Sequence, residues 1–264
     1  MATVTIPNTI TEIGVWAFTG SSLTSVTIPN SVTYIGFGAF TGSSSMTTIT
    51  VASDNPVYDS RDNCNAIIET ASNTLITGCK NTSIPSSIKF IGNYAFYACT
   101  SLASFTIPKS IISIGDNAFS DCSGLTSLTI PNTLDSIGYR AFCYCSSLKD
   151  VYCYINDPST LSIGNEVFYN SGLYDDRTLH VPVGSLEAYL EDTKWSRYFG
   201  AIVDDPLTCD VNADGWVSIA DVTALIDMVL RGDVSVADNP AADVNGNGII
   251  NIADVVELID QLLN

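Results

Sequence analysis

The first part of the chain contains recurring short runs of apolar residues interspersed with serine and threonine. In the run 125–130, Leu125, Leu128 and Ile130 are apolar, and serine or threonine fills the positions between them. This is strand periodicity, with the apolar residues pointing inward and the hydroxyl residues outward. Pro131 follows at once, and because proline lacks an N–H and has a fixed φ, we expect each strand to end there.

The same segment returns with a period of 22 or 23 residues up to about residue 150, as the runs 26–36, 105–115 and 128–138 show. Such a period predicts a solenoid, in which one repeat cannot bury its apolar face alone and neighbours must stack. We expect Gly138 to supply a permissive corner of its coil. The repeated phenylalanines should stack into an internal column: Phe18, Phe40, Phe96, Phe119 and Phe142.

The period is interrupted twice. Residues 52–82 form an insert, which we interpret as an irregular coil with a hairpin, and after Phe168 the pattern fades. Residues 179–203, with a helix expected from about Ser185, are the predicted C-terminal cap that such arrays require. Cys64 and Cys79 flank the inserted hairpin, and a disulfide and a pair of free thiols are both open alternatives.

Cysteine occupies one position in successive repeats, because Cys99, Cys122 and Cys145 are 23 residues apart. We interpret them as buried thiols that fill a small core site. Cys143 and Cys145 form a CxC pair, but the chain has no second such pair and one histidine. A four-ligand metal site is therefore not predicted here.

The repeated signature Ile-Pro-x-[Ser/Thr]-[Val/Ile/Leu]-x-x-Ile-Gly-x-x-Ala-Phe resembles the bacterial BspA-like leucine-rich repeats. The resemblance covers residues 1–203. It implies that this part of the chain is a mainly β leucine-rich-repeat solenoid with a C-terminal cap.

Two stretches near the C-terminus, 210–221 and 243–254, almost repeat each other. In each, oxygen-bearing side chains occupy loop positions 1, 3, 5, 9 and 12, and glycine occupies position 6. This spacing suits a Ca²⁺ ion wrapped in about six or seven oxygens, with the glycine permitting the sharp turn. An apolar stripe of helical period follows each loop, near Ile219–Leu230 and Ile252–Leu263. The sequence therefore predicts two bound calcium ions.

Residues 209–264 resemble a type I dockerin, the module that docks secreted proteins onto the cohesin domains of a scaffoldin in a cellulosome-type complex. An EF-hand pair is the alternative, but position 12 is aspartate rather than glutamate, and no entering helix precedes the first loop. The resemblance implies a small all-α domain joined to the solenoid by a linker at 204–208. The expected calcium ligands are side chains, together with the carbonyls of Trp216 and Ile249: Asp210, Asn212, Asp214, Trp216, Ser218 and Asp221 in the first loop, and Asp243, Asn245, Asn247, Ile249, Asn251 and Asp254 in the second.

The two loops differ in charge, because Asn247 stands in the second loop where Asp214 stands in the first. We therefore expect weaker calcium binding at the second loop. Without metal, the carboxylates crowded into each loop repel one another, so folding of this domain should be coupled to calcium.

The resemblance also places a cohesin-binding surface on the two exiting helices, at positions 10, 11, 17, 18 and 22 counted from the start of each loop. The first four residues are identical in the two copies, so a twofold-symmetric module can dock in two orientations. Isoleucine and alanine replace the family's common Ser-Thr pair, which predicts a more hydrophobic contact. Ile226 and Ile259 are either contacts or core residues, because Val222, Leu225 and Val229 already form an inward stripe. The predicted contacts are Ile219, Ala220, Ile226, Asp227 and Arg231, with Ile252, Ala253, Ile259, Asp260 and Asn264.

Charge and composition narrow the class of protein. The net charge of −18, without a basic stripe, excludes a nucleic-acid binder. From Asp205 onward there are eleven acidic residues and a single base, so the acidity gathers where calcium is predicted. No apolar run is long enough to cross a membrane, and no signal-peptide pattern is visible in the residues given. We expect an extracellular protein, because such calcium loops suit a calcium-rich space, and a natural precursor in which more sequence precedes residue 1.

Signatures of catalysis are missing from the chain: it has no P-loop, no dinucleotide fingerprint and no His-Glu-x-x-His motif. His180, the single histidine, lies in a strand-like run of the predicted cap, and we interpret it as a structural or surface residue. The array offers two outward surfaces. One is a strip of hydroxyl residues along the strands, and the other is a set of aromatic residues that suits protein or sugar contact: Trp16, Phe37, Tyr94 and Tyr139 after the Ile-Gly turns, with Tyr152 and Tyr154 near the end of the array.

The sequence thus predicts a non-catalytic, secreted interaction protein. Its dockerin should bind a scaffoldin cohesin in a calcium-dependent way, while the repeat array binds a protein or a carbohydrate. Two alternatives stay open: an enzymatic subunit of the same complex that acts on plant cell-wall polymers, since paired carboxylates can meet in space, and a calcium-binding adhesin without a cohesin partner.

Overall fold

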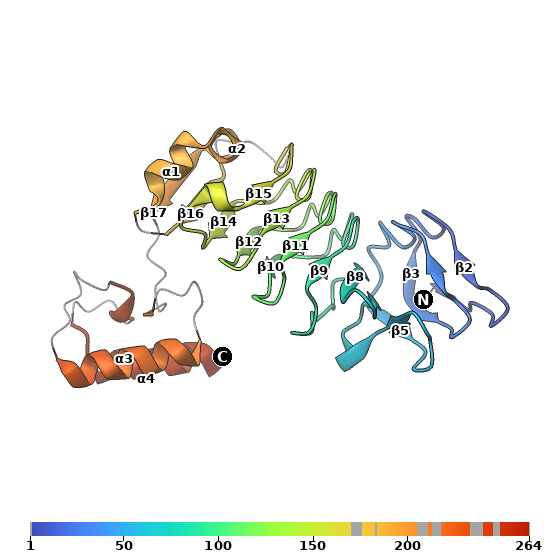
Figure 1. Ribbon diagram of the computed structural model, residues 1–264, viewed down its shortest axis with the longest axis horizontal. Helices are drawn as coiled ribbons and strands as arrows, with labels where there is room; N and C mark the ends of the chain where they lie inside the picture. The colour runs from blue at the N-terminus through green and yellow to red at the C-terminus, as the bar shows by residue number, and fades with distance from the viewer. Residues whose placement is uncertain are drawn as a thin grey trace.

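The repeats stack into a β-solenoid, followed by two C-terminal helices (Figure 1). The computed structural model describes residues 2–169, 176–182, 184–204, 211–212, 218–232, 240–244 and 249–263.

One long side of the solenoid consists of strands of three to six residues, all paired in parallel. Successive strands align residues one repeat apart, so that Ser104 pairs with Ser127, and Ser127 with Asp150. Two sheets make up this side: β1 (Ala2–Val4), β3 (Leu23–Ile28) and β5 (Thr48–Val51) form the first, and β10 (Ser104–Thr106), β12 (Ser127–Ile130), β14 (Asp150–Cys153), β16 (Thr178–Val181) and β17 (Ala201–Asp204) form the second.

Two-residue strands that precede the Ile-Gly turns form the opposite side. Their isoleucines point inward, and Ile91, Ile114 and Ile137 are almost completely buried. Because both sides face one interior, each coil is a thin slice of a common core. The strands are β2 (Glu12–Ile13) with β4 (Tyr34–Ile35), and β9 (Phe90–Ile91), β11 (Ser113–Ile114), β13 (Ser136–Ile137) and β15 (Ser162–Ile163).

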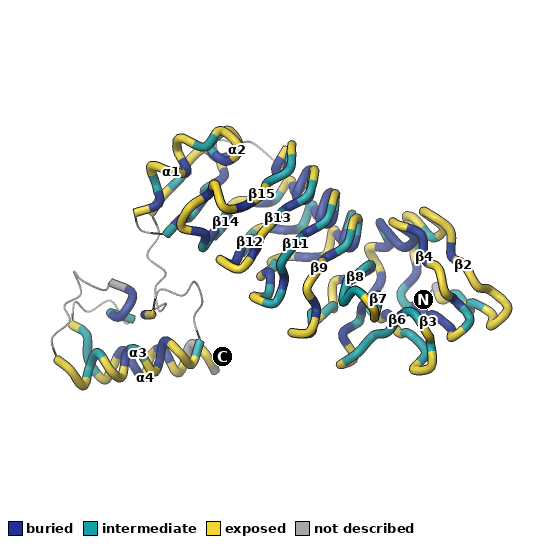
Figure 2. The backbone as a smooth tube through the Cα atoms, in the orientation of Figure 1, coloured by how far each residue is buried: buried dark blue, intermediate teal, exposed yellow. Residues whose placement is uncertain are grey.

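The insert at 52–82 forms an antiparallel arrangement of β6 (Tyr58–Asp59), β7 (Ile67–Glu69) and β8 (Thr74–Thr77), with a 3₁₀ turn η1 (Arg61–Asn63). β8 then pairs in parallel with β9, so the insert continues the sheet of the Ile-Gly turns. Neighbouring residues of β7 enter different cores: Ile67 joins the N-terminal hydrophobic cluster, and Ile68 the C-terminal one. The insert is a wedge between two packed blocks, both with buried interiors (Figure 2).

The internal column of phenylalanines is present on each side of the insert but is interrupted at it. A Cβ added to Gly78 would lie 2.2 Å from the ring of Phe96, so the hairpin occupies the space next to that ring. The prediction of one unbroken column is therefore wrong at this point. The stacked ring centroids lie 5.2 Å apart for Phe18–Phe40, 4.9 Å for Phe96–Phe119, 5.1 Å for Phe119–Phe142 and 5.7 Å for Phe142–Phe168.

The glycine of the Ile-Gly turn is required by close packing between coils, not by its φ. A Cβ on Gly138 would lie 2.6 Å from the backbone of Asp116 and Gly115, and the φ of Gly138 is not positive. The expected corner role of Gly138 thus has a different physical cause. The left-handed positions of the coil come later, as Tyr94 (φ 60°) and Arg140 (φ 53°) show two residues after their glycines.

The repeated cysteines form the predicted ladder of buried thiols. The thiol of Cys122 donates to the carbonyl of Phe96 and that of Cys145 to the carbonyl of Phe119, both at 3.2 Å. Burial raises the pKa of the Cys99 thiol to about 11 and that of Cys145 to about 12. In the insert, Cys64 and Cys79 are both buried free thiols. Of the two alternatives, the structure therefore has the pair of free thiols and not the disulfide.

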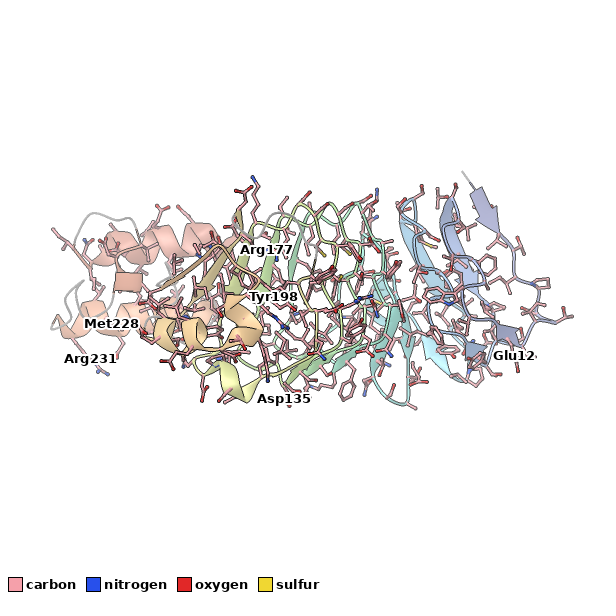
Figure 3. The ribbon with its side chains drawn as sticks, turned by 90° about the horizontal axis from the view of Figure 1, so that it is seen from above. Glu12, Asp135, Arg177, Tyr198, Met228 and Arg231 are labelled. Atoms are coloured by element: carbon pink, nitrogen blue, oxygen red, sulfur yellow. The ribbon has the colours of Figure 1, made fainter. Side chains whose placement is uncertain are left out.

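The last coil is closed by α1 (Leu186–Glu191), α2 (Thr193–Ser196) and strand β17. A short 3₁₀ turn, η2 (Pro158–Thr160), lies earlier in the chain, between β14 and β15. Trp195 is completely buried, with its ring centroid 6.0 Å from that of Phe168. The buried guanidinium of Arg177 donates to the carbonyls of Phe168 and Tyr198, at 3.4 and 3.2 Å, and lies next to Tyr198 (Figure 3). The cap therefore covers the apolar end of the core and also satisfies its carbonyl groups.

The C-terminal part contains α3 (Ile219–Arg231), a 3₁₀ turn η4 (Pro240–Ala242) and α4 (Ile252–Leu263). The side chain of Ser218 caps α3, and Gly232 ends it in the left-handed conformation with φ 69°. The two helices pack through a small aliphatic cluster that includes Val222, Leu225 and Leu258. Of the helices in the described ranges, none has the length and apolar character needed to cross a membrane.

Candidate functional site

Each C-terminal helix begins at a turn that holds a buried carboxylate. Asp221 and Asp254 are both 0% exposed, and each is the third residue of its helix. An Oδ2 atom accepts a hydrogen bond at 2.8 Å in both cases, from the N–H of Ser218 to Asp221 and from the N–H of Asn251 to Asp254. Because a buried charge is costly unless it is paired, these backbone hydrogen bonds help to compensate both carboxylates, and the predicted cation sites lie at the same two turns.

Other predicted ligands gather around these carboxylates. Oδ1 of Asp221 accepts a hydrogen bond from the N–H of Asn212 at 3.1 Å. In the second copy, Nδ2 of Asn251 donates to the carbonyl of Ile249 at 3.0 Å. The groups brought together in each turn are oxygen-rich, which is the donor chemistry that calcium prefers.

Five of the predicted calcium ligands lie outside the described residues: Asp210, Asp214, Trp216, Asn245 and Asn247. Asp243 is described and partly buried. Over the ranges that the structure describes, no three His, Cys, Asp or Glu side chains lie close enough to hold a metal ion. The residues that are described fit calcium in their chemistry, and the full ligand set stays a prediction.

The outer faces of α3 and α4 carry exposed apolar side chains at equivalent positions. Ile219 and Ile252 are 73% and 65% exposed. Ile226 and Ile259 are also exposed, at 40% and 37%. They are therefore surface residues and not core residues. Asn264 lies outside the described residues, and the other predicted contacts are exposed: Ala220, Asp227, Arg231, Ala253 and Asp260. Arg231 and Asp227 form an ion pair of 2.6 Å. Their role as cohesin contacts stays a prediction.

A second candidate site is an open groove of about 400 Å³ on the array. It crosses the Ile-Gly turns of successive coils and is lined by the serines at equivalent positions of β11, β13 and β15. Oγ of Ser136 donates to Oγ of Ser113 at 2.6 Å. Oδ1 of Asp116 accepts the N–H of Tyr139 at 2.7 Å, which ties one turn to the next.

Tyr139 is the large exposed side chain of this groove, and two charged residues fix its surroundings. The guanidinium of Arg140 lies 4.9 Å from the centroid of the Tyr139 ring. Arg140 binds Glu166 through Nε and Nη2, both at 2.6 Å. Tyr139 is among the residues predicted from the sequence, whereas Asp116, Arg140 and Glu166 are not.

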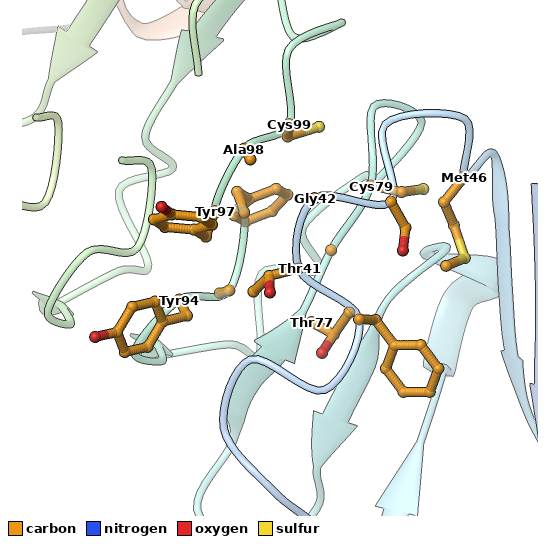
Figure 4. A pocket seen from close by; sticks show the side chains of 14 residues that line it. Thr41, Gly42, Met46, Thr77, Cys79, Tyr94, Tyr97, Ala98 and Cys99 are labelled. Carbon is orange, nitrogen blue, oxygen red and sulfur yellow. The ribbon is translucent and has the colours of Figure 1, made fainter. Parts of the chain in front are cut away.

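The other aromatic residues predicted on this edge form a cluster where the array is interrupted. The ring centroid of Trp16 lies 5.5 Å from that of Phe37 and 4.9 Å from that of Tyr94, and Tyr97 lies 5.7 Å from Tyr94. Beneath the cluster is a cavity of about 20 Å³, with Tyr94 and Tyr97 on one side and Met46 on the other (Figure 4). Since the rings contact one another, this cluster joins the two blocks across the insert.

The strand face of the array is a row of small polar side chains with His180 near its end. The hydroxyls of Thr27 and Thr50 lie 2.9 Å apart. The ring of His180 stacks on Tyr152 at 4.4 Å, and its Nε2 lies 3.3 Å from Oδ1 of Asp150. The histidine thus belongs to the outer surface of the sheet.

Two family models match the chain. A model of the BspA type leucine rich repeat region matches residues 1–75 and 65–187 in six copies, and a model of the dockerin type I domain matches residues 208–263. A search of curated proteins finds no match.

Among solved structures, the chain is similar to a leucine rich cell surface protein from Faecalibacterium prausnitzii A2-165, with a TM-score of 0.56 and 27% identity over 75% of this chain and 52% of that one. This chain therefore spans about half the length of that protein. It is also similar to a leucine-rich repeat protein from Eubacterium ventriosum, with a TM-score of 0.52 and 20% identity over 80% of this chain and 68% of that one. The second likeness shows the fold alone.

Proposed function

Because this chain belongs to the family of BspA type leucine rich repeat proteins and ends in a type I dockerin domain, we propose that it is a secreted, non-catalytic interaction protein held on an extracellular scaffold. Both module types are non-catalytic. The dockerin binds a cohesin of a scaffoldin in a calcium-dependent way, and the repeat array binds a protein or carbohydrate ligand. The similarity to a cell surface protein supports an extracellular place of action.

The duplicated C-terminal geometry carries this proposal. In both copies a buried aspartate at the start of a helix is followed on the outer face by the same exposed residues, Ile219 and Ile226 matching Ile252 and Ile259. Exposed apolar residues repeated at equivalent positions of both helices suit a protein interaction surface. Two copies related by a twofold present the same surface in either of two orientations.

Two calcium ions complete the module, one in each loop. The first is held by the side chains of Asp210, Asn212, Asp214, Ser218 and Asp221 with the carbonyl of Trp216, and the second by the matching set that ends at Asp254. When bound, calcium supplies the positive charge that the buried carboxylates require. The first loop binds more tightly because it has one more carboxylate. Calorimetric titration of Asp221→Asn and Asp254→Asn assigns the two affinities, and equal affinities would contradict the order.

The decisive test is a pull-down of the full chain with a panel of cohesin domains, in calcium and in a chelator. We expect capture by at least one cohesin in calcium and none in the chelator. The double variant Ile219→Asp with Ile252→Asp should abolish capture, because it places a charge on both copies of the apolar surface. Each single variant should still bind through the other copy.

Leu230→Asp is the matched control, because Leu230 is an apolar residue of α3 that is 80% exposed and lies outside the predicted contacts. It should bind as well as the unmodified chain. Capture that persists in the double variant, or that is lost in Leu230→Asp to the same extent, would reject the assigned surface. Failure with every cohesin would favour a calcium-binding adhesin. Turnover of a cell-wall polysaccharide would refute the non-catalytic assignment.

A further inference from the structure

We propose that the groove across the Ile-Gly turns binds a neutral polysaccharide chain lying along the axis of the solenoid. This ligand class rests on the proposed function of the array as the ligand-binding part. The shape of the groove, its charge and the placement of Tyr139 all support it.

The groove offers the same polar group in three successive coils. Ser113, Ser136 and Ser162 occupy one position in three successive coils and line the groove together. Neighbouring strands in such a ladder are about 4.8 Å apart. A polymer of identical units that lies across the coils can meet the same hydroxyl repeatedly, whereas a small ligand would use it once. The volume of about 400 Å³ is within the usual range for a ligand site.

The charge of the groove selects a neutral ligand. Its lining includes the carboxylate of Asp116 and the amide of Asn93, and no lysine or arginine belongs to it. Arg140, which lies beside it, is occupied by Glu166 in a two-point ion pair. Since the chain as a whole carries −18, a polyanion would be repelled at this surface.

The lining is also unlike a docking site for a folded protein. Ile114 and Ile137, which lie at its base, are 1% exposed, so they offer almost no apolar surface. Protein interfaces concentrate their binding energy in pockets that take large aromatic or aliphatic anchors. Hydroxyl, amide and carboxylate groups beside one aromatic ring instead match the hydroxyls and the apolar C–H faces of a sugar.

Tyr139 is placed to stack on a sugar ring. Its side chain is 40% exposed, and the Arg140 guanidinium and the Glu166 carboxylate hold its surroundings in place. A tyrosine has two side-chain torsions, so a ring that is already positioned loses little entropy on binding. The Asp116 carboxylate further fixes the backbone of this residue by accepting its N–H.

Affinity gel electrophoresis of the full chain in calcium, followed by calorimetry, tests the proposal. The neutral probes are mixed-linkage β-glucan, hydroxyethyl cellulose and galactomannan, and the polyanions are polygalacturonate and heparin. We expect retardation by at least one neutral polymer and by neither polyanion. Tyr139→Ala should weaken binding about tenfold through loss of the ring contact, while Tyr139→Phe, which keeps the ring, should stay close to the unmodified chain.

Tyr144→Ala is the matched control, since Tyr144 is an exposed aromatic of the same coil, also 40% exposed, and does not line the groove. It should leave binding unchanged. The proposal is overturned if no neutral polymer binds, if a polyanion binds more tightly, or if Tyr144→Ala weakens binding as much as Tyr139→Ala. Cohesin capture measured on the same variants separates the two proposals, because a groove failure leaves capture intact and a dockerin failure leaves polysaccharide binding intact.

Discussion

The repeat array and the C-terminal helices solve the problem of a stable core in opposite ways. In the array, rings and aliphatic side chains from neighbouring coils stack on one another, as Phe96, Phe119 and Phe142 do. The described residues of the array include no completely buried carboxylate. In the helical part, the aliphatic cluster is small, and Asp221 and Asp254 are buried beside it. The array is stabilised by stacked apolar side chains, whereas the helical part also buries two carboxylates, which accept backbone N–H groups at the starts of α3 and α4.

The largest expected difference between the two parts is their response to calcium removal. Type I dockerin domains bind calcium, and a site that is not preformed in the unfolded chain makes metal binding part of the folding free energy. Excess chelator should therefore abolish the helical signal of α3 and α4 in circular dichroism while the thermal transition of the array stays where it was. Restoring calcium should restore the helices. An equal fall in the stability of the array on chelation would mean that the two parts do not differ in this way.

The next effect tests whether the array depends on stacking from both sides. Phe119 is 0% exposed and lies between two stacked rings, while Phe18 is partly buried and stacks on Phe40. Phe119→Ala should lower the free energy of unfolding of the array by about 3–5 kcal/mol, and Phe18→Ala by clearly less. Urea titration followed by near-UV circular dichroism measures both. Equal losses would contradict stacking as the main source of stability, and the calcium transition of the helices serves as the unaffected reference.

High pH should act on the array through its buried thiols. An unfolded thiol has a pKa of about 8.5, whereas burial raises the pKa of Cys99 to about 11 and that of Cys145 to about 12. The folded array retains these protons where the unfolded chain has released them, so the thiols contribute full stability below about pH 8.5. That contribution is lost as the pH rises toward the folded values.

The midpoint of thermal unfolding of the array should therefore fall more steeply between pH 8 and pH 10 than it does between pH 6 and pH 8. The triple variant Cys99→Ala, Cys122→Ala and Cys145→Ala should flatten this slope whatever its absolute stability. An unchanged slope in the triple variant would assign the effect to other titrating groups.

The solenoid and the helices were predictable because each follows from a local pattern repeated many times. A period of 22 or 23 residues defines which positions stack, and the apolar stripe near Ile219–Leu230 corresponds to the observed α3 (Ile219–Arg231). The break in the phenylalanine column was not predictable in the same way. It depends on how the inserted hairpin docks, which places Gly78 against Phe96 through contacts distant in sequence.

The groove on the array was missed for a related reason. Arg140 and Glu166 stand at the same position of neighbouring coils, so aligning the repeats in columns would have paired them, but their distance along the chain hides the pair. Asp116 belongs to the groove because its carboxylate reaches the backbone of the next coil. In a solenoid, the informative neighbour of a residue is one repeat away.

The smallest expected effect is that of replacing alanine by glycine, which should change the stability of the two parts in opposite directions. Ala98 has φ 55°, a left-handed conformation in which a Cβ costs roughly 1–2 kcal/mol, so Ala98→Gly should stabilise the array by about 1 kcal/mol. Ala224 lies inside α3, where glycine is about 0.5–1 kcal/mol worse than alanine, so Ala224→Gly should destabilise the helices. Denaturant titrations with separate probes for the two parts measure both changes. If both variants are destabilised alike, the left-handed turn is not strained, and the array tolerates side chains there because its neighbouring coils hold the turn in place.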